Sequence, residues 1–317
     1  MSKKRRLAAG TALVVVLATL AVVMSIGASA QPVQSQASIK LGFITKFPVD
    51  FFFVLQNGAK SWNKSHKNVT IMFAQGKSAT DDAGEIAAIQ NMVASGVKGI
   101  AITPTSPAVI PALNKAVKAG VKVVLMDNDL PTWKLKTAVV ATNNLKGGAL
   151  AGKWLAAKLK AGDTLGILEG VPGVPALDDR VNGMLAGLGS KRAQVKIVSK
   201  LETDCDQTKG AQAAQTMLTA NPSLTAIYSA CGPPALGAIQ SIKNAGIKPG
   251  GIILVGFDGL TDEVAAIKAG TESASVAQHP SKIGSMGVAT LYAAVIGKKV
   301  TKKVDTGTSL ITPANAK

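Results

Sequence analysis

Polar side chains directly follow two apolar, strand-like runs near the C-terminal end of the chain. Residues 252–257 lead into Asp258, and residues 273–277 lead into Gln278, with one helical stretch between them. In an open parallel sheet, ligands bind just beyond the carboxyl ends of the strands. This spacing predicts that Asp258 and Gln278 present hydrogen-bonding groups to one shared cleft. The alternative is that Asp258 caps the next helix and Gln278 belongs to a linker.

A third strand-like run, residues 121–126, ends in Asp127, Asn128 and Asp129. Each carboxylate accepts hydrogen bonds at two oxygens, which suits vicinal hydroxyls or an amine. We expect these three residues to bind a ligand. The alternative is a plain turn that leads to Pro131.

Three consecutive aromatic residues, Phe51, Phe52 and Phe53, open the first helical stretch after the first strand-like run. Consecutive residues cannot all face the core from one helix. We therefore expect at least one of them to project into the cleft, where its ring can pack on the C–H face of a sugar or polyol. The alternative is the default for such a helix, in which two of the three pack in the core.

The loop at residues 170–180 is rich in Gly and Pro and presents the start of a helix. Asp178 and Asp179 fit the positive end of that helix's dipole, and Asp178 is also a candidate ligand-binding residue. Arg180 would either reach the ligand or brace aspartates in the cleft.

The chain has two cysteines, Cys205 and Cys231, and each follows a strand-like segment. An exported protein with two cysteines favours a disulfide, and neighbouring strand ends can bring the two Cα atoms close enough. Two unpaired thiols are the alternative. A catalytic cysteine is not favoured, because only His279 would serve as its base and no third orienting group is evident. The two Cys and two His are not at metal-ligand spacing, and no nucleotide-binding glycine motif follows a strand, so we expect neither enzyme activity, metal nor cofactor.

Around these residues, strand-like runs and helical stretches alternate along the chain. Near-continuous apolar strands in this alternation predict an α/β fold with parallel sheets covered by helices on both faces. About ten strands are too many for one small sheet, and the alternation pauses at residues 141–144 and 278–280. We therefore predict two Rossmann-like lobes, with the last helix, residues 281–296, returning to the first lobe.

The N-terminus has the pattern of a targeting segment. Four basic residues, 3–6, precede an uncharged run to Ala30, and the small residues 28–30 fit a cleavage site. We expect a signal peptide at 1–30 and a polar spacer at 31–38, with an uncleaved membrane anchor as the alternative. The protein would then act outside the cytoplasm. The net charge is +17, or +13 without the four leader cations. The lysines are scattered, and the sequence has no basic run interleaved with aromatic residues, so we do not expect nucleic-acid binding.

In the order and spacing of several short stretches, the chain resembles the periplasmic sugar-binding proteins of the ribose-binding type, which are the solute receptors of ABC importers. The matching positions are 51–52 with 57–59, 102–105, 124–127, 180–183, 206 with 209–210, 235–238, 255–259, and 277–278 with 280. The resemblance implies a type I periplasmic binding protein with a three-segment hinge. Its N-terminal lobe would comprise 39–142 and 279–306, and its C-terminal lobe 143–278 and 307–317.

The resemblance also assigns roles to individual residues. It implies that Phe51 and Phe52 pack on the sugar, and that Asp127, Asp258 and Gln278 bind its hydroxyls. The family's ribose receptors have arginines where this chain has Asn128 and Asp178, and an aromatic residue and an asparagine where it has Cys205 and Cys231. These departures indicate a neutral polyhydroxylated ligand other than ribose, either a different sugar or a sugar alcohol.

The implied partners are a small sugar or polyol and an ABC permease in the membrane, and we expect a monomer in the periplasm or at the outer face of the cell membrane. Delivery to a sensor or chemoreceptor is the main alternative. A transcriptional regulator of the same core fold would carry a helix-turn-helix where this chain has a leader. An extracellular cysteine hydrolase is the third alternative.

Overall fold

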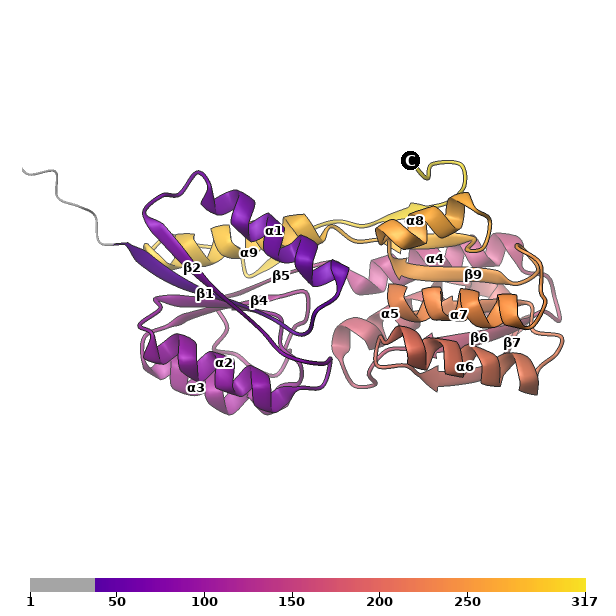
Figure 1. Ribbon diagram of the computed structural model, residues 1–317, viewed down its shortest axis with the longest axis horizontal. Coiled ribbons are helices and arrows are strands. Elements are labelled where there is room, and N and C mark those ends of the chain that lie inside the picture. The colour runs from indigo at the N-terminus through magenta and orange to yellow at the C-terminus, as the bar shows by residue number, and fades with distance from the viewer. Residues whose placement is uncertain (1–37) are drawn as a thin grey trace, which may run out of the picture. The chain divides into compact units, whose positions relative to one another are not determined.

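The computed structural model describes residues 38–317, and these residues form two six-stranded sheets flanked by helices (Figure 1). The first sheet has the strand order β11-β5-β4-β3-β1-β2. Its strands are β1 (Ile39–Thr45), β2 (Val69–Gln75), β3 (Gly99–Ile102), β4 (Lys122–Met126), β5 (Ala138–Ala141) and β11 (Lys303–Asp305). The second sheet has the order β12-β10-β9-β8-β6-β7. Its strands are β6 (Thr164–Glu169), β7 (Lys196–Glu202), β8 (Ala226–Ser229), β9 (Ile253–Asp258), β10 (Ala274–Ala277) and β12 (Ser309–Ile311).

Helices cover both faces of each sheet (Figure 1). One face of the first sheet packs against α1 (Asp50–Asn63) and α9 (Pro280–Val295). The other face packs against α2 (Asp82–Ala94) and α3 (Ile110–Lys118), and a 3-10 turn, η1 (Pro107–Val109), precedes α3. The second sheet packs against α4 (Asn144–Lys158) and α5 (Pro175–Gly187), and against α6 (Gln207–Ala220) and α7 (Gly232–Asn244). A 3-10 turn, η2 (Gly189–Ala193), follows α5, and α8 (Thr261–Lys268) lies beside α7. We call each sheet with its helices a lobe, N-terminal and C-terminal.

The strands pair in parallel, apart from β12, which runs antiparallel to β10. The central strands β3 and β8 are buried along their whole length, as expected for strands with helices on both faces. The predicted α/β fold class with two Rossmann-like lobes is therefore confirmed. In a parallel sheet all carboxyl strand ends lie at the same edge, so each lobe gathers its strand-end residues at one edge.

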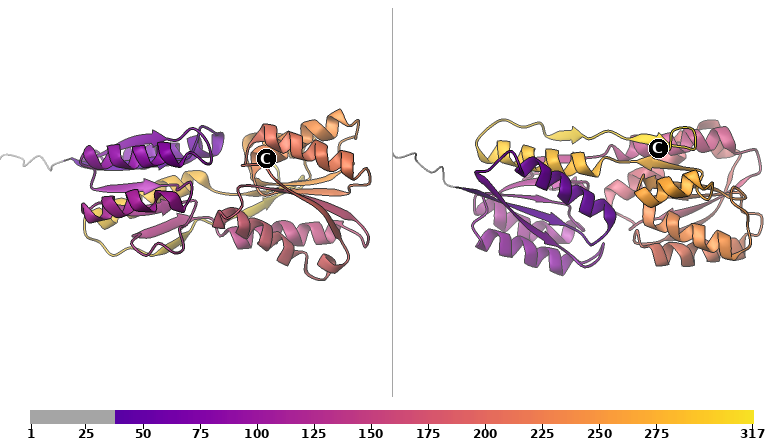
Figure 2. Two further views of the ribbon diagram at one scale, coloured as in Figure 1. Left: turned by 90° about the horizontal axis from the view of Figure 1, so that it is seen from below. Right: turned by 45° about the horizontal axis from the view of Figure 1, so that its top comes forward.

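The chain passes between the two sheets three times, which confirms the predicted three-segment hinge. The crossings lie between β5 and α4, between β10 and α9, and between β11 and β12. Helix α9 returns to the first lobe, where it packs along α1, β3, β4 and β5. The yellow C-terminal segment that carries β11 and β12 makes the last crossing (Figure 2).

Two strands were missed by sequence reasoning. Each of β11 and β12 has three residues and joins the edge of a sheet, where no residue is fully buried. Strands this short carry too few alternations to be seen as a pattern. The predicted signal peptide and almost all of the predicted spacer lie outside the described residues. Within residues 38–317, no helix is both long and apolar enough to cross a membrane.

Candidate functional site

Residues of both lobes line a cavity of about 60 Å³ at the carboxyl ends of the strands. Nine of the eleven residues predicted from the sequence to bind ligand line it: Phe51, Phe52, Asp127, Asn128, Arg180, Cys205, Cys231, Asp258 and Gln278. The sequence placed most of these residues directly after strands or at the start of helices, and parallel topology brings those positions together. This cavity is the candidate ligand site.

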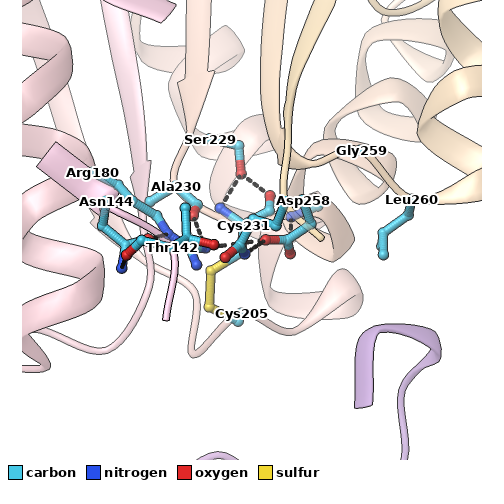
Figure 3. Close-up of polar contacts among 12 residues, drawn as sticks. Thr142, Asn144, Arg180, Cys205, Ser229, Ala230, Cys231, Asp258, Gly259 and Leu260 are labelled. Carbon is cyan, nitrogen blue, oxygen red and sulfur yellow. Dashed lines mark hydrogen bonds and ion pairs between the residues drawn. A yellow bond between two sulfur atoms is a disulfide. The ribbon is translucent and has the colours of Figure 1, made fainter. Parts of the chain in front are cut away.

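Asp258 is the centre of a hydrogen-bond network in the C-terminal lobe (Figure 3). Its Oδ1 accepts hydrogen bonds from Gln278 Nε2 at 2.6 Å and from Arg180 Nη1 at 3.2 Å. Its Oδ2 accepts from the backbone N–H of Gly232, at the start of α7, at 3.1 Å. Asp258 has a φ of +110°, a value that L-residues rarely adopt, so the end of β9 is held in a strained turn that aims the carboxylate at these donors.

Arg180 braces this network from α5. Its Nε donates to Asn144 Oδ1 at 2.9 Å, its Nη1 also donates to the Ala230 carbonyl oxygen at 2.9 Å, and its guanidinium lies 4.1 Å from the centre of the Phe257 ring. Helix α5 approaches α4 closely because both carry glycines at the contact; a Cβ at Gly148 would collide with the Arg180 carbonyl oxygen. Of the two roles predicted for Arg180, the structure shows the bracing of a cleft aspartate.

The environment of Asp258 has opposing effects on its charge. Burial raises the pKa of the Asp258 carboxyl, and the Arg180 guanidinium, the Gly232 N–H and the Gln278 amide each lower it. A buried carboxylate with a cation and two further donors is well satisfied. Asp258 is therefore a preformed acceptor on the C-terminal side of the cavity.

Asp127 lies in the N-terminal lobe, directly after β4, and its environment differs. Its backbone has a φ of +61°, and its N–H donates to the Val140 carbonyl oxygen at 2.9 Å. The side chain is 7% exposed, and its Oδ1 has no hydrogen-bond partner among the described residues. Burial raises the pKa of Asp127 to about 6, although Arg180 and Lys46 lower it. The neighbouring Asn128 is buried and donates from Nδ2 to the Pro104 carbonyl oxygen at 3.3 Å.

The three consecutive phenylalanines do not all face the same side of α1. Phe51 and Phe52 are both buried, both line the cavity, and their rings meet edge-to-face at 5.3 Å. Phe53 is 44% exposed and does not line the cavity. The two buried rings belong to the core of the N-terminal lobe and also form a wall of the cavity.

Cys205 and Cys231 form a disulfide, as predicted, with a Cα–Cα distance of 5.5 Å. The bond joins the loop after β7 to the residue that precedes α7, and both cysteines line the cavity with Val171 and Leu177. With both thiols paired, neither cysteine is a nucleophile.

Two predicted residues lie outside this cavity. Asp129 forms an ion pair with Lys136 at 2.7 Å, and Asp178 accepts a hydrogen bond from the Gly173 N–H at 3.2 Å in the first turn of α5. Both carboxylates thus have local partners. In residues 38–317, no group of three or more His, Cys, Asp or Glu side chains is arranged to hold a metal ion.

Two functional candidates were missed from the sequence. Lys46, the first residue after β1, lines the cavity, and Asn144, the first residue of α4, orients Arg180. The same strand-end rule that selected Asp258 could have selected Lys46, whereas nothing local marks Asn144 as a partner of a residue 36 positions away.

A model of the periplasmic binding protein domain matches residues 41–299. The chain belongs to the periplasmic binding protein family. Among curated relatives of this binding protein is the ribose import binding protein of Bacillus subtilis, which is 34% identical over 256 residues that cover 80% of each chain.

Two solved structures of ABC transporter solute-binding proteins are similar to this family member over most of their length. One from Agrobacterium vitis with bound D-fucose has a TM-score of 0.81 and 29% identity, with 87% of this chain and 96% of that one covered. One from Mycobacterium smegmatis with bound glycerol has a TM-score of 0.82 and 27% identity, with 88% and 96% covered.

Proposed function

We propose that this binding protein captures a neutral sugar or sugar alcohol in the cavity and delivers it to an ABC importer. One observation carries the proposal: a buried, unpaired carboxylate oxygen of Asp127 and the Asp258–Arg180–Gln278 network line one cavity beside two phenylalanine rings. Carboxylates accept hydrogen bonds from hydroxyls, and aromatic rings pack on the C–H faces of sugars. The names of the relatives support this ligand class, since they include a ribose import protein and proteins with bound D-fucose and glycerol.

The proposed mechanism is closure of the two lobes around the ligand. Asp127, Asn128, Phe51 and Phe52 would bind from the N-terminal lobe, and Asp258 with the disulfide from the C-terminal lobe, while Gln278 lies at the hinge. A ligand that contacts both lobes binds the closed state better than the open one, so binding shifts the equilibrium toward closure. The hinge would lie at the boundaries 142/143, 278/279 and 306/307.

Export and transport complete the proposal. The leader pattern of residues 1–30 and the periplasmic family both support export to the periplasm or the outer face of the membrane. The partner would be the membrane permease of an importer, which recognises the closed monomer. Because the family and the curated relative are named for binding and import, they support neither an enzyme nor a chemoreceptor component.

A thermal-shift screen over pentoses, hexoses and polyols, followed by calorimetry, tests the proposed function. A ligand at 100 times its Kd adds about 2.7 kcal/mol to the free energy of unfolding, which raises the Tm of a protein of this size by about 5 °C or more. Uptake of the same ligand into vesicles that hold the permease should require the binding protein. No binding of any sugar or polyol would overturn the proposal.

A further inference from the structure

Lys46 is a lysine buried in the wall of the candidate cavity. It is 5% exposed, although lysines are rarely buried without a partner. Among residues 38–317, its ammonium forms no hydrogen bond, and the ion pairs of this region all involve other cations. A cation that lines the cavity and has no partner among the described residues is a candidate binding group.

The backbone on both sides of Lys46 is fixed in place. The Gly76 N–H donates to the Thr45 carbonyl oxygen at 3.1 Å, and Gln75 Nε2 donates to the Phe47 carbonyl oxygen at 2.7 Å. Gly76 lies so close to the Lys46 carbonyl oxygen that a Cβ would collide with it. Because β1 is paired on both edges, by β2 and β3, the start of the Lys46 side chain is preorganised toward the cavity.

The charges around Lys46 point to Asp127 as its counterpart. Burial lowers the pKa of Lys46; the Asp127 carboxylate is the charge that raises it most, followed by Glu85, while Arg180 lowers it and Asp82 raises it slightly. Strand β3 separates β1 from β4, so Lys46 and Asp127 leave the sheet two strands apart at the same edge. One is an unpaired donor and the other an unpaired acceptor.

We propose that Lys46 binds the ligand and determines its specificity, sharing one ligand hydroxyl with Asp127. The hydroxyl donates a hydrogen bond to the Asp127 carboxylate and accepts one from the Lys46 ammonium, so it satisfies both groups at once. This inference rests on the proposed function and narrows the ligand to one with a hydroxyl at that position.

The same charges select for a neutral ligand. Four charged side chains line the cavity: Lys46, Asp127, Arg180 and Asp258. Arg180 is paired with Asp258, and Lys46 balances Asp127, so the formal charges cancel. An anionic ligand would add an uncompensated charge to a buried site, which is costly. Sugar acids should therefore bind more weakly than the corresponding neutral sugars.

Calorimetry on Lys46→Met tests the inference, with Lys77→Met as the matched control, since Lys77 is exposed and both changes remove one positive charge. The probes are D-ribose, D-allose, D-fucose, glycerol and xylitol, then the monodeoxy forms and the aldonate of the tightest binder. We expect Lys46→Met to weaken the tightest binder about 10- to 100-fold, the loss typical of a hydrogen bond from a charged donor, and Lys77→Met to change it less than about twofold.

A change in ligand specificity distinguishes a ligand-binding role of Lys46 from a structural one. One monodeoxy analogue should bind the wild-type protein weakly. Lys46→Met should reduce the difference in affinity between that analogue and the parent, and the double variant Lys46→Met with Asp127→Asn should nearly abolish it. Losses from Lys46→Met and Asp127→Asn should be clearly less than additive in the double variant, because both act on one hydroxyl. If the methionine variant does not fold, Lys46→Gln takes its place.

The possible contrary results distinguish failure of this inference from failure of the proposed function. Unchanged affinity in Lys46→Met, additive losses or tighter binding of the aldonate would overturn the inference, while wild-type binding of any neutral probe would leave the proposed function standing. If the wild-type protein binds none of the sugars and polyols, the proposed function fails as well.

Discussion

The two lobes contribute polar groups of different kinds to the same cavity. On the C-terminal side, Asp258 already accepts hydrogen bonds from Arg180, Gln278 and the Gly232 N–H. On the N-terminal side, Asp127 has an unpaired oxygen, and Lys46 has no partner among the described residues. The contrast is between an aspartate whose two carboxylate oxygens both have partners in the protein, although Gln278 Oε1 beside it has none, and an aspartate and a lysine whose side chains have no partner among the described residues.

This difference separates stability from recognition. A buried group that already has partners contributes to the fold whether or not ligand is bound, and removing one partner leaves the others unsatisfied. A buried group without partners is stabilised most by a ligand that supplies those partners, so it contributes mainly to binding. We therefore expect variants in the C-terminal wall to lose stability and binding together, and variants in the N-terminal wall to lose binding alone.

The largest effect is expected for Asp258→Ala. The substitution leaves the buried Arg180 guanidinium without its carboxylate, which typically costs about 3–5 kcal/mol of unfolding free energy, and it removes an acceptor from the cavity. Urea unfolding and calorimetry should both show the loss. Asp262→Ala, at an exposed position in the first turn of α8, is the control and should stay within about 1 kcal/mol. If Asp258→Ala is as stable as the wild-type protein, the proposed difference between the two walls is wrong.

The second effect concerns the disulfide of the same wall. Replacing Cys205 and Cys231 together by serine opens a loop with a sequence separation of 26 residues, for which chain entropy gives a loss of about 3.5 kcal/mol. Affinity should fall only a few-fold, because the Asp258 network remains. Urea unfolding with and without dithiothreitol measures this: reductant should destabilise the wild-type protein and leave the serine variant unaffected.

A smaller and different effect is expected for Asp127→Asn in the N-terminal wall. Affinity should fall about 10- to 100-fold as the charged acceptor is lost. Because the folded-state pKa of Asp127 is raised to about 6, its protonation stabilises the folded protein below pH 4, and this contribution is lost as the pH rises through 6. The neutral asparagine should therefore not reduce the unfolding free energy of the ligand-free protein at pH 7.

The titration of Asp127 also predicts a pH dependence of binding. Only the ionised carboxylate accepts the ligand hydroxyl at both oxygens, so wild-type affinity should fall as the pH drops below about 6. Asp129→Asn, two residues further along and outside the cavity, should keep this pH profile. If the pH dependence of affinity persists in Asp127→Asn, it is caused by the titration of another group.

The smallest effect is expected for Glu272→Gln, beneath the C-terminal wall. Glu272 and Glu263 are buried against Gly256 in β9. Burial and the Asp258 charge raise the pKa of Glu263 to about 8, and burial and the Glu263 charge raise the pKa of Glu272 well above its usual value. Raised carboxyl pKa values stabilise the folded state when protonated, so the wild-type Tm should fall as the pH rises through 8.

Glu272→Gln removes one of these ionisations and should reduce that fall by a few degrees, with affinity at pH 7 almost unchanged. Glu169→Gln is the matched control, since Glu169 is partly exposed and paired with Lys200. If both variants show the wild-type pH dependence of the Tm, the buried pair does not carry it.

Much of the fold and part of the site could be predicted from the sequence. Apolar runs with the right length and helices with capping residues marked ten of the twelve strands and the order of the helices. Asp127, Asp258 and Gln278 stood out because each follows such a run, and topology then brings strand ends to one edge. The sequence could not separate Asp127 from Asp129, since the choice depends on the left-handed turn at Asp127 and on the nearby Lys136.

By itself, the sequence determined which residues alternate between strands and helices and which polar residues end the strands, because these are local patterns of period and turn chemistry. The tertiary structure alone decided which of these side chains are satisfied. Arg180 contacts Asp258 across 78 positions and Asn144 across 36, while the side chains of Lys46 and Asp127 have no such partner in the part of the chain that the structure describes. Partnership between buried groups depends on packing between distant segments, and no local pattern records it.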